Sequence, residues 1–382
     1  MKIASRVWWF LVAMFDWRTL WRQIRGQPIV DVVFISNLRD EVDRDRSFGN
    51  RYPAEGHVNG PRYWFGNVAA RIRVIDSTPK DLATSAGRKK AKEQFVSATG
   101  WAREHGARVV LLAAGTKRLF GEQASELKAL FPDILFTIGD SGTTWLLRAE
   151  TLRALHSAGL MPGASRVCVI GPTGFLGESV TELLVEHGYD VVGLCNSPDG
   201  VEKCGIEAYS SFKEIGKVDA VVACTHADGV SLSPKTIGIL RREGKRLLLV
   251  DPSEPANLRR SKYEECRDVV IRQDAGNAYS AKLEYVLGAV SYKMLRMTKG
   301  VVFGCFAEAL VLASALLKSD IAVLRHDWFA VSEENRQVVG ELFRVNGFSI
   351  PSARCFGKPV TSFDLGISRP SHRAASALTE TS

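Results

Sequence analysis

The segment RVCVIGPTGFLGESVTELLVEHGYDVVGLCN, residues 166–196, constrains the fold more than any other part of this chain. It has the pattern of an apolar strand, a glycine-rich turn, a helix and a second apolar strand. A unit of about 30 residues in this order implies a right-handed crossover between parallel strands, and hence a doubly wound sheet. Further strands of the same sheet are expected at 219–224, 246–251 and 268–273.

The glycine-rich turn, Gly171-Pro-Thr-Gly-Phe-Leu-Gly177, stands between a strand ending at Ile170 and a helix beginning near Glu178. Glycines let a backbone turn sharply and approach a pyrophosphate, while the helix N-terminus supplies free N–H groups. In this context a dinucleotide site is favoured over a purely structural turn. The expected cofactor-binding residues are Gly171, Thr173, Gly174, Phe175, Leu176, Gly177, Asn196, Ser197 and Thr225.

The end of the second strand indicates which dinucleotide is bound. Sites for NAD usually place an acidic residue there to bind the ribose hydroxyls, whereas this chain has Cys195-Asn196-Ser197. Without the acid nothing repels a 2′-phosphate, and Asn196 and Ser197 can donate to one. The nearest base is Lys203. NADPH is therefore the expected cofactor.

The sequence predicts an α/β fold with two domains. Residues 31–150 alternate strand-like and helix-like segments, and 382 residues, 46% of them hydrophobic, are enough for two cores. The expected parts are a basic amphipathic helix (1–30), a smaller N-terminal α/β domain (31–150), a Rossmann-type doubly wound domain (151–325), a C-terminal helix (326–350) and a disordered tail (351–382).

Two polar residues are expected at the ligand-binding edge of the second sheet. His226 follows the strand at 219–224, and Asp251 closes the strand at 246–251. Ligands of open parallel sheets bind outside these strand ends. His226 is thus either a general acid or a side chain that lines the cleft, and Asp251 is a lining residue. The other histidines show no metal-ligand spacing, so no metal is expected.

Cys305 begins the stretch CFAEALVLA after Gly304. At a helix start, the free N–H groups and the helix dipole lower a thiol pKa. Glu308 is expected to bond this helix start, and its charge opposes a thiolate. The local pattern also fits a small buried residue, and alone it favours that interpretation. The chain has seven cysteines without CxxC spacing, which is typical of a reducing, cytoplasmic compartment.

The formal net charge of +8 is concentrated at the two ends of the chain. Residues 1–30 hold five basic residues and one acidic residue, and residues 351–382 hold four and two. A nucleic-acid-binding protein spreads basic residues over a folded face. Nucleic acid is therefore not an expected partner.

The apolar residues of the first thirty positions recur at helical spacing. The members of this face are Ile3, Val7, Phe10, Met14, Trp17, Trp21 and Ile24. The unbroken apolar run 7–15 is far shorter than the ~20 residues of a membrane span. Two interpretations stay open: a helix at the inner face of the membrane, or an arm packed on the body or on a second copy.

The order of motifs resembles the long-chain fatty acyl-[acyl-carrier-protein] reductases best known from cyanobacteria. The resemblance runs from about Phe34 to Ile350 and is carried by TIGDSGTTW (137–145), the glycine motif, VDPSEPANL (250–258), AGNA (275–278) and GCFAEALVLA (304–313). The last of these is the most specific. The chain departs from the family at Pro252-Ser253-Glu254 and near Ala275-Gly276. Both loops are expected to face the cleft, so a different acyl chain or carrier is expected.

This resemblance implies a function. Cys305 takes the place of the family's acylated nucleophile, and an acyl-carrier-protein or CoA thioester becomes the expected substrate. NADPH then reduces the cysteine-bound acyl group to an aldehyde. Residues 31–150 would bind the acyl group, and Ser141, Thr143 and Gly276 would line the site beside Asp251.

Two other functions stay open. One is an NADP-dependent reductase of a different carbonyl compound, in which Cys305 is structural. The other is a non-catalytic, NADP-binding protein that assists a lipid enzyme at the membrane.

Overall fold

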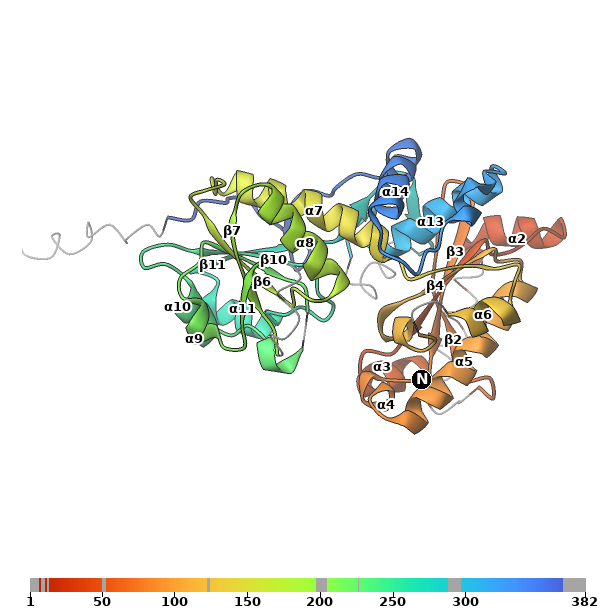
Figure 1. Ribbon diagram of the computed structural model, residues 1–382. Coiled ribbons are helices and arrows are strands. Elements are labelled where there is room, and N and C mark those ends of the chain that lie inside the picture. The colour runs from red at the N-terminus through yellow and green to blue at the C-terminus, as the bar shows by residue number, and fades with distance from the viewer. Residues whose placement is uncertain are drawn as a thin grey trace, which may run out of the picture. The chain divides into compact units, whose positions relative to one another are not determined.

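The computed structural model describes residues 7, 11, 14–49, 53–121, 124–196, 205–225, 227–287 and 297–366. The chain divides into two compact units, and many of their elements are labelled in Figure 1. Unit 1 consists of Met1–Leu146 and Gly276–Pro351, and unit 2 of Leu147–Ala275 and Ser352–Ser382. The chain passes from one unit to the other at three points, the first of which falls inside helix α7, Asp140–Ser157.

Unit 2 contains a six-stranded, fully parallel sheet in the order β11-β10-β9-β6-β7-β8. Its strands are β6 (Arg166–Ile170), β7 (Asp190–Leu194), β8 (Glu207–Tyr209), β9 (Ala220–Ala223), β10 (Leu247–Asp251) and β11 (Val270–Asp274), and its helices are α8 (Phe175–Glu186), α9 (Phe212–Ile215), α10 (Pro234–Leu240) and α11 (Arg260–Cys266). In chain order the strands run 6-5-4-1-2-3, which is the Rossmann arrangement. The predicted doubly wound sheet is confirmed.

Unit 1 contains a mixed sheet in the order β13-β2-β3-β1-β4-β5. Its strands are β1 (Val32–Asn37), β2 (His57–Phe65), β3 (Val68–Ile75), β4 (Val109–Leu112), β5 (Leu135–Thr137) and β13 (Leu283–Tyr285). Strand β2 is antiparallel to its neighbours and was not expected from the sequence. Its hydrophobic alternation is interrupted by Gly60-Pro61, where the register with β3 shifts.

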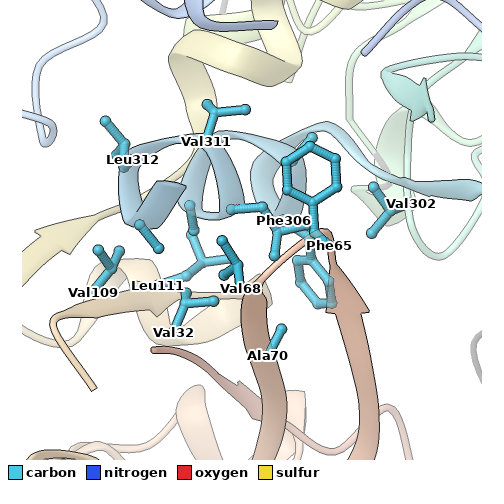
Figure 2. Close-up of a cluster of buried hydrophobic side chains, with 14 of the residues drawn as sticks. Val32, Phe65, Val68, Ala70, Val109, Leu111, Val302, Phe306, Val311 and Leu312 are labelled. Atoms are coloured by element: carbon cyan, nitrogen blue, oxygen red, sulfur yellow. The ribbon is translucent and has the colours of Figure 1, made fainter. Parts of the chain in front are cut away.

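Helices cover both faces of the unit 1 sheet. Val33 and Ile35 of β1 pack on the side of α5 (Ser85–Glu104) and α6 (Ser125–Leu130). Val32 and Phe34 pack on the opposite side, with α13 (Gly304–Leu317) and α14 (Glu333–Asn346). Figure 2 shows α13 above the strands, with Phe306 on the side of the helix that faces Val32 and Val68 and with Val311 on the opposite side. This alternation follows from the two-residue period of a strand.

The remaining elements are short. They are α2 (Trp17–Ile24), α3 (Glu41–Ser47), α4 (Pro79–Leu82), β12 (Asn277–Tyr279), β14 (Val301–Phe303), β15 (Arg354–Cys355), β16 (Lys358–Pro359) and the 3-10 helices η1 (Ala114–Arg118), η3 (Asp228–Val230) and η4 (Ile321–Arg325).

The observed units differ from the expected domains in size and in bounds. The N-terminal α/β unit was expected to be the smaller one, but unit 1 is the larger because it also includes 276–351. Residues 276–325 were assigned to the dinucleotide-binding domain but belong to unit 1, because β13 extends its sheet and α13 covers it. The expectation of a disordered tail is wrong for residues 352–366, because Val360, Phe363 and Leu365 pack on the core of unit 2. Residues 367–382 lie outside the described part of the chain.

The packing predicts the cost of opening a cavity under α13. Leu111 of β4 is fully buried in this core, so Leu111→Ala should lower the free energy of unfolding by about 2–5 kcal/mol. Leu130→Ala is the matched control because Leu130 is 50% exposed. Urea unfolding measures both variants, and an equal loss in the two would contradict this account of the core.

Candidate active site

Cys305 is the second residue of α13, which begins at Gly304. The backbone of another segment lies directly against it: a Cβ added to Gly139 would be 2.2 Å from the Cys305 Cβ. Gly139 also has φ +72°, so only glycine suits this position. On the other side, Gly304 N donates to the Gly276 carbonyl at 2.8 Å. The start of α13 is therefore held between two loops of unit 1.

The charged side chains that influence the thiol are Lys117, Asp140 and Glu308. Burial raises the pKa of the Cys305 thiol to about 11, and the Asp140 and Glu308 carboxylates act in the same direction. The Lys117 ammonium and the Phe306 N–H act in the opposite direction. The expectation of a lowered thiol pKa at the helix start is thus wrong, because desolvation outweighs the helix N-terminus.

Lys117 and Asp140 form an ion pair beside the thiol. Burial lowers the pKa of the Lys117 ammonium, but Asp140 outweighs this effect, so the net pKa is raised and the side chain stays charged. Lys117 was not singled out from the sequence, although η1 begins two residues after β4 ends. That position, at the carboxyl end of a parallel strand, is the signal that identifies it.

Glu308 lies fully buried and bonds a different helix from the one expected. Its carboxylate accepts from the Thr137 hydroxyl, and from the Gly142 N–H at 2.6 Å. Gly142 is in the first turn of α7, where N–H groups have no intrahelical partner. Glu308 therefore caps α7 rather than the start of its own helix. Burial raises the pKa of Glu308 to about 7 despite these two bonds.

The residues expected to line the substrate site fall into both units. Ser141 is buried in the first turn of α7, and the Thr143 hydroxyl donates to the Gly139 carbonyl at 2.9 Å. With Gly276 they lie in unit 1, as does Cys305. Asp251 lies in unit 2, where its buried carboxylate accepts from the Arg272 guanidinium and the Ser253 N–H. Asp251 is therefore bonded to other residues in the interior of unit 2.

The glycine loop of unit 2 has the geometry of a phosphate cradle. Gly171 has φ +80°, and a Cβ added to Gly177 would lie 1.9 Å from the Gly171 carbonyl oxygen. Gly174, the N-cap of α8, contributes no side-chain hydrogen bond, which leaves the first-turn N–H groups available to an anion. The loop follows β6, next to β9, where the strand order reverses.

The other expected cofactor residues lie within this loop, next to it, or outside the described part of the chain. Thr225 follows β9, and its methyl carbon would be 2.9 Å from a Cβ on Gly171. Thr173, Phe175 and Asn196 are exposed, while Leu176 is partly buried. Ser197 and His226 lie outside the described residues. The strand order and this loop together give unit 2 the architecture of a dinucleotide-binding domain.

Comparison with known proteins finds distant likenesses only. No protein-family model and no curated protein matches the chain. L-tryptophan dehydrogenase from Nostoc punctiforme is 15% identical, with a TM-score of 0.37 over 83% of this chain and 89% of that one. The NADPH-dependent glyoxylate/hydroxypyruvate reductase from Sinorhizobium meliloti, in complex with NADP and sulfate, is 17% identical. Its TM-score is 0.28, over 62% of this chain and 77% of that one.

The chain spans 59% of the length of the same reductase in its apo form, with a TM-score of 0.27. Similarities of this size carry no argument about activity. The fold of unit 2 rests on its own strand order, and none of these comparisons supports the acyl-[acyl-carrier-protein] reductase family in particular.

The charges around Cys305 predict opposite effects of two substitutions on its reactivity. Lys117→Met removes the cation and should raise the thiol pKa, whereas Asp140→Asn removes an anion and should lower it. Below pH 11 the first variant should therefore react more slowly with iodoacetamide than wild type, and the second faster. Mass spectrometry of the Cys305 peptide across pH 7–11 measures the rates.

Lys128→Met is the matched control, because Lys128 pairs with Asp327 at 3.0 Å on the surface of unit 1. Its rate should equal that of wild type. If Lys117→Met and Asp140→Asn shift the rate in the same direction, the described electrostatics are wrong.

Proposed function

We propose that the chain is an NADPH-dependent oxidoreductase that reduces an acyl thioester to an aldehyde through an acyl group held on Cys305. The observation that carries the proposal is the pairing of two sites in one chain. Unit 1 places a thiol at the start of a buried helix beside a lysine, and unit 2 has a glycine loop of dinucleotide-binding geometry. The motif resemblance supports an acyl-carrier-protein or CoA thioester as substrate.

The thiol begins the reaction in its protonated form, because its pKa lies near 11. As the sulfur attacks the thioester carbonyl, it must lose a proton, and the departing carrier thiolate takes one up. The Lys117 ammonium stabilises the negative charge that develops on sulfur, and Asp140 holds that ammonium in place. The products of this step are the Cys305 acyl thioester and the free carrier thiol.

The residues of unit 2 suited to the dinucleotide are those of the glycine loop. The N–H groups at the start of α8 would hold the pyrophosphate, and Thr225 flanks the loop. Bound NADPH supplies the hydride that takes the acyl carbon to the aldehyde level. When the carbon–sulfur bond then breaks, the sulfur returns as a thiolate beside Lys117 and is ready for reprotonation.

A second function is favoured by one observation. The raised pKa and the surrounding protein make Cys305 a poor nucleophile at rest. This favours a reductase of another carbonyl compound, in which Cys305 only packs against the loop at Gly139. The two functions differ in whether an acyl-enzyme forms.

A measurement of whether the Cys305 thiol becomes acylated therefore distinguishes the two functions. The wild-type protein, incubated with palmitoyl-CoA or palmitoyl-acyl-carrier protein without NADPH, should gain one acyl group by intact-mass spectrometry, and Cys305→Ala should not. Cys266→Ala is the matched control and should be acylated like wild type. Adding NADPH should remove the adduct and release an aldehyde. An undiminished adduct in Cys305→Ala would contradict the covalent step, and an adduct that survives NADPH would contradict the reductase activity.

The glycine loop allows a separate test of cofactor binding. Gly177→Ala places a methyl group against the Gly171 carbonyl, which must displace the loop. The affinity for NADPH, measured by fluorescence titration, should fall more than about tenfold, which corresponds to 1.4 kcal/mol. Gly238→Ala is the control, since a Cβ there meets nothing within 4 Å. Unchanged affinity in Gly177→Ala would remove the loop from the cofactor site.

A further inference from the structure

Helix α2 is attached to unit 1 through its polar side. The buried Asp16 carboxylate, at its N-cap, accepts from the Trp64 indole N–H at 3.1 Å and from the Arg62 guanidinium at 3.1 Å. Six residues later, Arg22 binds the Asp31 carboxylate at 2.8 Å and the Asn67 carbonyl at 2.6 Å. These bonds determine which side of α2 faces the sheet.

The apolar side of α2 consequently faces solvent. Trp17, Leu20, Trp21 and Ile24 follow one another at steps of three, one and three, which places them on one face of a helix. Their exposed fractions lie between 42% and 78%. An ordinary surface helix buries such residues and exposes its polar ones. Here the arrangement is inverted.

The exposed apolar face continues beyond the helix and has positive charge beside it. Met14 and Phe15, just before α2, are 52% and 61% exposed. The Arg25 guanidinium lies 4.5 Å from the centre of the Trp21 ring. The first thirty residues hold five basic side chains and one acidic one, Asp16, which is paired with Arg62. Arg18 and Arg22 are themselves paired with Glu284 and Asp31, so the positive charge beside this face is that of Arg25.

We propose that this face, formed by Trp17, Leu20, Trp21 and Ile24, binds the surface of an anionic lipid bilayer. Tryptophan rings and guanidinium groups are the side chains that favour the headgroup region. Among the described residues, no helix has the length and apolar character needed to cross a bilayer. The helix therefore lies on the surface, attached to unit 1 by Asp16 and Arg22.

The size of the face argues against a second copy of the chain as its partner. Eight helical residues extend about 12 Å, and a helix with its side chains is about 10 Å wide. A stable protein–protein interface needs about 800 Å² from each partner, far more than one such face offers. A bilayer needs no matching surface, because it deforms around the inserted side chains.

Vesicle binding by the full chain tests the proposal. Wild type should co-sediment with vesicles of phosphatidylcholine and phosphatidylglycerol, and less with pure phosphatidylcholine. Replacing Trp17, Trp21 and Ile24 together by Ser should lower the vesicle partition coefficient at least about tenfold. Arg25→Gln should weaken binding to the anionic vesicles only. All four positions are exposed, so the variants should keep the wild-type circular dichroism spectrum.

The control is a double variant, Leu130→Ser with Val345→Ser, at exposed apolar positions on α6 and α14. It should bind vesicles like wild type. Equal binding by wild type and the triple variant, or no binding by wild type, would overturn the proposal. A wild-type dimer in light scattering that the triple variant loses, without vesicle binding, would identify a second copy as the partner and also overturn it.

This proposal does not depend on the proposed function. Acylation of Cys305 by soluble palmitoyl-CoA should be the same in the triple variant and in wild type. Loss of vesicle binding with acylation intact therefore tests the surface alone, and loss of acylation in Cys305→Ala tests the chemistry alone.

Discussion

The packing of α13 on the sheet of unit 1 is the interaction on which the candidate site depends. Phe306 stacks on Phe34 of β1 with ring centres 4.3 Å apart, and nearly all other residues of the helix are buried. A helix that is apolar on all sides is stable only inside a core. Because Phe306 is locked in that core, its neighbour Cys305 is placed against the loop at Gly139 with little freedom to move.

The same burial determines the electrostatics of the site. Removing water raises the pKa of both the Cys305 thiol and the Glu308 carboxyl, since each loses hydration of its charged form. The partly buried Lys117 ammonium opposes the effect on the thiol. Glu308 meanwhile joins α13 to the first turn of α7 through Gly142. The residue that holds the two helices together thus also sets part of the charge around the thiol.

Much of the architecture could be predicted from local patterns. The strand–glycine–helix–strand unit at 166–196 predicted the parallel sheet of unit 2, because period and turn chemistry act over short distances. Strand β2 was missed because Gly60-Pro61 interrupts its alternation. The assignment of 276–325 failed for another reason: β13 pairs with β2, more than two hundred residues earlier, and local patterns carry no information about such pairings.

The sequence by itself determined the α/β class, the glycine loop with its missing acidic residue, and the presence of a cysteine before an apolar helix. Glu308, three residues after that cysteine, could be expected near it from the sequence. Only the tertiary structure decided that Lys117 and Asp140 also act on the thiol, because they come from two other segments that converge on α13 through sheet order and helix packing. It also decided that α2 turns its polar side inward, because Asp16 binds Trp64 and Arg62 on β2, and Arg22 binds residues just before β1 and β3. Hydrogen bonds to buried groups outweighed the tendency of apolar side chains to leave water.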